Sequence, residues 1–448
     1  KLDEIDNNGL PPLLHVDLEN NVDIAMKLLN SVPEQLTALG GDKLAKQKVE
    51  AISYTLETTP RYYKIINDYL RSNDGALGDQ FSFFCKRHSV LNFENKRRYC
   101  VKQLQMSTAT MKSITLDGGD LTYKNIKSKW LSQNKQPFRM SFGGVELSRD
   151  VQTSSFRSLF KDICSEEYNL LRYLSKSGVF YPSSKATVQD MELLGVLIGL
   201  VLAYEVTLDV VVFSIGFLKE VLGESIILDD LLQYDSNTYT TLKSHENDQD
   251  IAEKNLSFTI KTEDGSIQEL CNEGHTKTVT KDNLSKYTSL CAKSIMTTGL
   301  QDHIVSFKKG LRSVDCKDVL SMFSALELSL LINGNGNISA DQLRSIVEYV
   351  GYNESSEQIR WFWHVVTKMS ESERAMLVQR ITGNTFNKSN TVIIQKISQE
   401  EEQRLQRVVD VGSNKFYIPE HINYEVLEKY VLCFARFGHC GNTITTKT

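Results

Sequence analysis

Residues 327–385 read ELSLLINGNGNISADQLRSIVEYVGYNESSEQIRWFWHVVTKMSESERAMLVQRITGNT. Four apolar side chains in the part from 358 to 367 recur at steps of three and four residues, the spacing of one helix face: Ile359, Phe362, Trp363 and Val366. Ser370, followed three residues later by Glu373, is the pattern of a capping box at the start of a second helix, and Gly383 supplies its end. The stretch therefore predicts two consecutive helices.

One part of this stretch imitates a calcium-binding loop. Its polar residues fall at the inner positions of an EF-hand frame: Asn333, Asn335, Gly336 and Asn337, followed by Ile338. The first and last positions of the frame would be Leu331 and Gln342, so the two carboxylates that hold the ion are absent. The sequence therefore predicts no metal site here.

Downstream of this stretch the composition changes. Residues 384–390, NTFNKSN, are polar and predict a mobile linker, and TVIIQKI at 391–397 is typical of a strand. The chain closes with a predicted helix, 426–437, in which Cys433 is expected to be a small core residue. Residues 384–448 are therefore expected to form a separate small unit.

Upstream, the sequence begins with helical patterns. Apolar residues in 22–40 and 44–72 stand at helical spacing and predict an all-helical extension. The next segment, 92–106, reads NFENKRRYCVKQLQM and is basic on one side. No aromatic interleaving supports nucleic-acid binding there, so the pattern favours a solvated helix face.

Two further segments lie between these ends. Residues 193–204 are uncharged, but Glu192 and Glu205 bracket them, and a membrane span needs about twenty such residues. This segment therefore predicts a buried core helix. Between 222 and 300, LSFTIKTEDGSIQEL alternates, breaks at its Asp-Gly pair and resumes, which predicts a hairpin within a small α+β insertion.

Composition limits the class of protein. The chain has 448 residues, 41% of them hydrophobic, which is enough for two or three domains with a large core. The net charge of −5, from 51 basic and 56 acidic residues, supplies no field that would recruit nucleic acid or an anionic membrane. Eight cysteines without C-x-x-C pairs predict reduced thiols in a cytosolic or nuclear setting. The start at Lys1, without a signal-peptide pattern, suggests a part of a longer chain.

The quoted stretch carries a family resemblance in four motifs. They are the E-L-x-L-L-I opening at Glu327, the E-Y-x-x-Y segment from Glu348 to Tyr352, W-F-W at 361–363 and the final Thr382-Gly383. Together these motifs resemble the HECT-type ubiquitin ligases.

Segments upstream follow in the order of that family. The matches are the apolar run at 193–210, LDDLLQYDSNTYTTL at 228–242, LSFTI at 256–260 and VTKDNLSKY at 279–287. The resemblance covers about residues 140 to 448. Further upstream, LNFENKRRYCVKQL at 91–104 resembles the stretch before this domain in the giant Huwe (Mule) branch.

The resemblance implies a fold and a division into domains. It implies an α+β, bilobal protein: a helical extension 1–92, a large lobe 93–383 carrying a small subdomain 222–300, and a carboxyl-terminal lobe 384–448. A ubiquitin-conjugating enzyme would dock on the small subdomain and pass ubiquitin to a cysteine of the carboxyl-terminal lobe, which then passes it to a lysine of a protein substrate. No cofactor is implied.

Several residues match functional positions of the family. The residues implied for conjugating-enzyme binding are Leu242, Leu256, Phe258 and Tyr287, and Phe437 matches the family's near-terminal phenylalanine. The nucleophile stands within R-L-P-x-x-H-T-C-F-N-x-L-x-L-P, where residues 404–419 read RLQRVVDVGSNKFYIP.

The cysteine itself is missing from this frame. Alignment on Asn414 and Pro419 places its position at Gly412, and alignment on Arg404 and Leu405 places it at Val411. The preceding His and Thr are replaced by Asp410 and Val411. A thioester needs a thiolate, which neither glycine nor valine supplies.

A second segment also departs from the family. Residues 150–160 read DVQTSSFRSLF where the family has D-x-G-G-x-x-R-E-W-F/Y; Arg157 keeps its place, but the glycines and the acidic residue do not. Three interpretations stay open: a ligase that has lost its covalent step, a non-catalytic binding or scaffold module, and an active ligase with a relocated thiol such as Cys440, next to His439.

Overall fold

The computed structural model describes most of the chain from residue 60 to residue 437. The described ranges are 60–73, 75–78, 82–85, 88–116, 122–142, 149–208, 210–247, 250–261, 265–315, 317–334, 338–383, 391–405 and 409–437. Most of the predicted helical extension, the expected linker 384–390 and Cys440 lie outside these residues. The same holds for the centre of the calcium-loop imitation.

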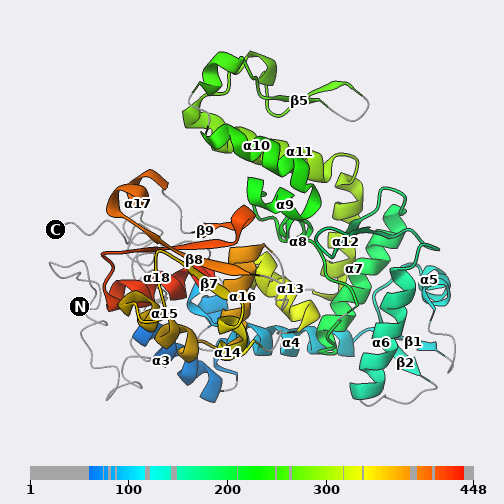
Figure 1. Ribbon diagram of the computed structural model, residues 1–448. Coiled ribbons are helices and arrows are strands. Elements are labelled where there is room, and N and C mark those ends of the chain that lie inside the picture. The colour runs from blue at the N-terminus through cyan, green and yellow to red at the C-terminus, as the bar shows by residue number, and fades with distance from the viewer. Residues whose placement is uncertain are drawn as a thin grey trace, which may run out of the picture.

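Figure 1 shows three parts: a large helical part, a small α+β part that projects from it, and a carboxyl-terminal part built around a sheet. The helical part contains α4 (Phe93–Ala109), β1 (Lys112–Leu116), α5 (Tyr123–Ser132), β2 (Phe138–Phe142), α6 (Arg149–Ile163), β3 (Leu171–Leu174), β4 (Val179–Pro182), α7 (Val188–Ala203), α8 (Ile215–Leu222), α12 (Gln301–Val314) and α13 (Ala325–Asn333). The small part contains α9 (Leu231–Tyr234), α10 (Ser236–Ser244), β5 (Thr259–Lys261), β6 (Ile267–Glu269) and α11 (Leu284–Thr297). The predicted α+β fold class is confirmed.

The centre of the helical part is the pair α7 and α12. A capping box of Thr187 and Asp190 starts α7, and all its residues from Leu193 to its end are buried, as expected of a core helix. The two backbones touch, because a Cβ on Gly195 would stand 2.1 Å from the carbonyl oxygen of Phe307, and one on Gly310 would stand 1.8 Å from that of Glu192. Among the described residues, no helix is both long and apolar enough to cross a membrane.

The carboxyl-terminal part is organised by a four-stranded sheet in the order β7-β8-β10-β9. Its strands are β7 (Val347–Val350), β8 (Val392–Ile397), β9 (Val409–Asp410) and β10 (Lys415–Pro419). β8 pairs in parallel with both β7 and β10, and the short β9 runs antiparallel to β10. The other elements of this part are α14 (Ala340–Arg344), α15 (Glu357–Lys368), α16 (Glu371–Thr382), α17 (Gln399–Leu405) and α18 (Tyr424–Phe437).

Local predictions in this part are confirmed. The two helices that the 327–385 stretch predicts are α15 and α16; the capping box of Ser370 and Glu373 starts α16, and Gly383 ends it at φ +68°. The strand expected at 391–397 is β8. Cys433 is buried in α18, as expected.

The sheet bears on the division between the lobes. β7 lies upstream of residue 383, yet it pairs with β8. α16 packs against the same sheet, α15 contacts it through the Phe362 and Phe416 rings, and both helices pack against α18. The boundary between 383 and 384 stays a prediction, but the topology groups residues from β7 onward with the carboxyl-terminal part.

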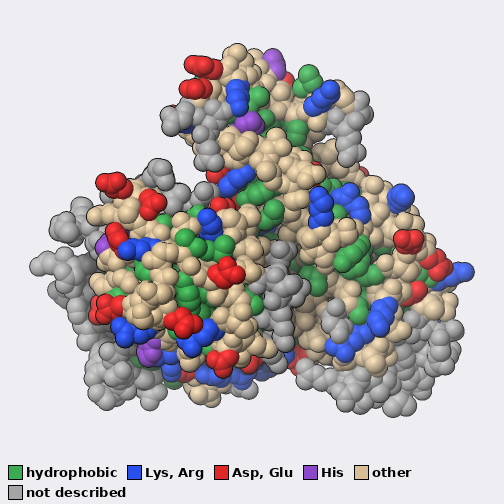
Figure 2. All heavy atoms as spheres, viewed as in Figure 1, with side chains coloured by type: hydrophobic (Ala, Val, Ile, Leu, Met, Phe, Trp, Pro, Cys, Tyr) green, Lys and Arg blue, Asp and Glu red, His purple; other side chains and the backbone are tan. Residues whose placement is uncertain are grey.

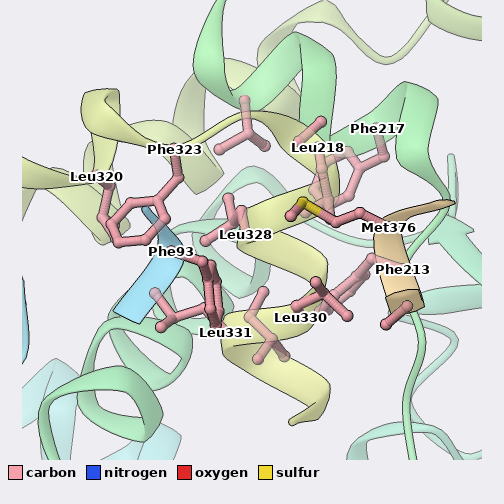
Figure 3. Close-up of a cluster of buried hydrophobic side chains, with 14 of the residues drawn as sticks. Phe93, Phe213, Phe217, Leu218, Leu320, Phe323, Leu328, Leu330, Leu331 and Met376 are labelled. Carbon is pink, nitrogen blue, oxygen red and sulfur yellow. The ribbon is translucent and has the colours of Figure 1, made fainter. Parts of the chain in front are cut away.

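The core continues between the parts. Figure 3 shows α13 at the centre of a buried cluster, with Met376 of α16 reaching toward Leu218 of α8. The helix α3 (Pro60–Ser72), the α-helix described within the extension, packs against both α4 and α18. It therefore bridges the helical and carboxyl-terminal parts.

The helix α4 differs from its prediction in one residue. Arg98 and Lys102 are exposed, as expected of a solvated face, but the Lys96 side chain is only 6% exposed. Its Nζ lies 2.9 Å from Glu327 Oε1 and 3.0 Å from Oε2, in α13. Lys96 is therefore an internal charge with an internal partner.

Candidate functional site

Gly412, which the resemblance aligns with the family's cysteine, lies in a short loop between two strands. Val411–Ser413 form one turn of 3-10 helix between β9 and β10. Asn414 follows in the left-handed region at φ +55°, and its carbonyl oxygen accepts a hydrogen bond of 2.9 Å from the Ile393 amide in β8. Ser413 Oγ donates to Asp410 Oδ2 at 2.9 Å, which closes the loop on itself. The loop is therefore held by its own bonds and by the sheet.

The loop faces the small part of the molecule. A Cβ on Gly412 would stand 3.0 Å from Oη and 3.1 Å from Cε1 of Tyr239, in α10. Tyr239 Oη bonds Asp229 Oδ1 at 3.2 Å. Burial, and then the carboxylates of Asp229 and Asp410, raise the pKa of Tyr239, so it stays a protonated phenol. The surroundings of residue 412 are thus phenolic and acidic.

The described loop, residues 409–414, contains no cysteine and no histidine. In the family frame the residue before the cysteine is Thr and the one before that is His; here Val411 is buried and Asp410 is an acid. Asp410 would disfavour a thiolate placed beside it, because like charges raise a neighbouring pKa. The loop therefore lacks the residue types that the family resemblance implies at these positions.

The cysteines that the structure describes belong to other elements. They are Cys85, Cys100, Cys164, Cys271, Cys291 and Cys433. Burial raises the pKa of Cys164 to about 12 and that of Cys291 to about 11, so both stay protonated near neutral pH. Within the described ranges, no group of three His, Cys, Asp or Glu residues is placed to hold a metal.

The four residues implied for conjugating-enzyme binding come together in the small part. However, Leu242, Phe258 and Tyr287 are buried, and only Leu256 is partly exposed. The Phe258 and Tyr287 rings meet edge to face at 5.5 Å between centroids. These three side chains therefore lie in the interior of the small part, and their role in conjugating-enzyme binding stays a prediction.

Among the described residues of this part, Ile267 is the most exposed large apolar side chain. It is 75% exposed and lies in β6, which pairs with β5 in the predicted hairpin. Sequence reasoning missed it, although the alternation around the Asp-Gly pair places Ile267 on the hairpin. The available signal was the hairpin pattern itself, because a two-stranded ribbon leaves at least one of its faces open to solvent.

The final helix is anchored near Phe437, its last residue. Arg380 of α16 donates from Nε to the Ala435 carbonyl oxygen and from Nη2 to that of Arg436, each at 3.0 Å. Arg436 pairs with Glu373 at 2.6 Å, and its guanidinium lies 3.8 Å from the centre of the Tyr63 ring of α3. Nothing is described of the Phe437 side chain, so its role stays a prediction.

The altered segment 150–160 lies within α6. Phe156, Leu159 and Phe160 of this segment are buried, so its apolar face belongs to the core of the helical part.

Figure 2 shows acidic and basic side chains scattered together over the visible face, which fits the small net charge.

Known proteins are similar to most of this chain. The family model described as HECT-domain (ubiquitin-transferase) matches residues 157–433. The probable E3 ubiquitin-protein ligase TOM1 of Eremothecium gossypii is 27% identical over 427 residues, which is 89% of this chain and 13% of that protein.

Two further relatives agree. The E3 ubiquitin-protein ligase UPL2 of Arabidopsis thaliana is 24% identical over 76% of this chain and 10% of its own length, and HUWE1 of Mus musculus is 26% identical over 72% and 8%. The chain spans about a tenth of the length of these relatives. With the family model matching more than half of it, this chain belongs to the HECT-domain family.

Proposed function

We propose that this chain is the HECT region of a larger protein in a cytosolic or nuclear setting. In this proposal the region binds a ubiquitin-conjugating enzyme but does not accept ubiquitin itself. The observation that carries the proposal is Gly412, which stands at the nucleophile position against the Tyr239 hydroxyl. Acyl transfer to this loop would need a thiolate, and neither aligned position, 411 or 412, supplies one.

Binding without chemistry is the second half of the proposal. The small part keeps its hairpin, its buried Phe258 and Tyr287 pair and its position on the helical part, so the scaffold that would receive the enzyme persists. The exposed Ile267 offers an apolar anchor of the kind on which interfaces concentrate their energy. Ubiquitin and protein substrates would then be partners of the larger protein, with this region serving as a docking module.

The decisive experiment is a charging assay. The wild-type chain, mixed with a ubiquitin-loaded conjugating enzyme and run on a non-reducing gel, is expected to give no adduct that a reducing agent removes. The HECT region of a relative such as HUWE1 is the positive control. A reducible adduct on the wild-type chain would contradict the proposal, and its loss in Cys440→Ala would assign the activity to a relocated thiol.

Restoring the thiol alone is expected to give at most a trace of reducible adduct. In Gly412→Cys the new side chain would press on Tyr239, and the carboxylates of Asp410 and Asp229 near that hydroxyl would hold the thiol protonated. Adding Asp410→His and Val411→Thr removes one of these charges and returns the family's pair, so the triple variant is expected to give more adduct.

The same charging assay measures both variants. The control is Ser413→Cys, which offers a thiol one residue further along the same loop. Robust thioester formation by Gly412→Cys alone would mean that only the nucleophile had been lost and that its surroundings were intact.

A further inference from the structure

The loop that carries Gly412 closes a joint between the carboxyl-terminal part and the small part. We propose that glycine at position 412 is a conformational element: the absence of a side chain lets the loop seat on Tyr239 and holds the two parts in one closed arrangement. This inference concerns the joint and holds whether or not ubiquitin is transferred.

The contact at Gly412 leaves only a tight fit for a side chain. The 3.0 Å and 3.1 Å that would separate its Cβ from Oη and Cε1 of Tyr239 are shorter than ordinary van der Waals contacts. Gly412 does not have a positive φ, so its backbone would accept any residue without strain. The restriction at this position therefore comes from the neighbouring part of the molecule.

Tyr239 cannot easily move away. Its side chain is 4% exposed, and its Oη is tied to Asp229 at 3.2 Å. Asp235, the N-cap of α10, accepts bonds from two backbone amides of the helix, which fixes the turn on which Tyr239 stands. The side chain is therefore held at its backbone by the capped helix and at its hydroxyl by Asp229.

The loop is held just as firmly on its other side. Val411 is buried against the end of α16, where its Cγ1 lies 2.9 Å from the place a Cβ on Gly383 would take. Gly383 in turn offers its carbonyl oxygen to Gln233 Nε2 of α9. Gln233 is buried and also accepts from the Ile215 amide at 3.0 Å through its Oε1. One joint thus connects the loop, the end of α16 and the helices α8 to α10.

A side chain at 412 would therefore require the loop or Tyr239 to shift by a few tenths of an ångström, and we expect this shift to loosen the joint. A cysteine falls under the same restriction as an alanine and adds a sulfur beyond the Cβ. The replacement of the thiol by glycine has two physical consequences: it removes the nucleophile, and it permits the closed packing of the part that carried it.

Hydrogen exchange under native conditions tests the joint. Gly412→Ala is expected to speed exchange of segments 409–414 and 236–244 by about tenfold, because the open state gains population while each part stays folded. Without the contact the sign would be reversed, since Gly→Ala at an unstrained site stabilises by restricting the unfolded chain. Exchange in α7 and α12 is expected to stay unchanged, which shows that the variant is folded.

The matched control is Gly78→Ala. Gly78 also stands in a three-residue 3-10 helix, is exposed, and would place a Cβ 3.9 Å from its nearest neighbour, Tyr99. This variant is expected to leave exchange in both segments unchanged.

A double-variant cycle assigns the effect to Tyr239. In Tyr239→Leu the obstructing hydroxyl and ring edge are gone, so Gly412→Ala is expected to change exchange by less than about twofold in that background. An unchanged or slower exchange in Gly412→Ala alone, or a tenfold effect that persists with Tyr239→Leu, would overturn the proposal.

Discussion

Lys96→Met is expected to destabilise the packing of α4 on α13 by about 3 to 5 kcal/mol, because it removes the ammonium that bonds both oxygens of the buried Glu327 carboxylate. The two side chains are 6% and 7% exposed, and both carboxylate oxygens accept from Nζ. Glu327 also closes the capping box at the start of α13 with Ser324. The loss is measured as the free energy of opening of α4 and α13 by native-state hydrogen exchange.

Two variants bracket this result. Lys102→Met changes an exposed lysine on the same helix and is expected to cost less than about 0.5 kcal/mol. Lys96→Met combined with Glu327→Gln removes the unpaired charge while an amide keeps the cap, and it is expected to recover most of the loss. A single variant that lies within about 1 kcal/mol of the wild type would mean that the pair contributes no more than a surface ion pair.

Phe258→Ala is expected to cost the small part about 3 to 5 kcal/mol, the range for removing a buried aromatic ring. The Phe258 side chain is 4% exposed, and its ring packs edge to face against the Tyr287 ring. Its backbone amide donates to the carbonyl oxygens of Gly274 at 3.0 Å and Lys277 at 3.1 Å. Exchange of segments 256–260 and 284–297 measures the change, while α7 and α12 are expected to keep their protection.

The control separates stability from binding. Ile267→Ala removes an exposed side chain and is expected to change stability by less than about 0.5 kcal/mol while weakening any conjugating-enzyme binding by about 1 to 2 kcal/mol. If Phe258→Ala weakened binding and left the small part as stable as in the wild type, Phe258 would be a contact residue after all, as the family resemblance implied.

Local structure was readable from the sequence because its causes lie within a few residues. The capping box of Ser370 and Glu373, the helix end at Gly383 and the strand 391–397 are all set by neighbours in the chain, and all three are present. The uncharged run after Glu192 predicted a core helix because its length decides between a core and a membrane. That residue 412 is a glycine is likewise read directly from the sequence.

Contacts between residues far apart in the chain could not be predicted from local patterns. Lys96 and Glu327 are 231 positions apart, and nothing near Lys96 distinguishes it from the exposed lysines of its helix. The burial of Phe258 was hidden because an apolar residue in a short strand fits a docking surface and a core equally well. β7 joined the carboxyl-terminal sheet by pairing with a strand some forty residues downstream.

The sequence by itself determined the family, the local elements and the absence of a cysteine from positions 411 and 412, because motifs, caps and periodicity act over short distances. The tertiary structure decided which charges are internal, which apolar residues are covered, and that residue 412 lies against Tyr239. Those properties depend on packing between segments, where a few tenths of an ångström separate a contact from a clash and no local pattern records the neighbour.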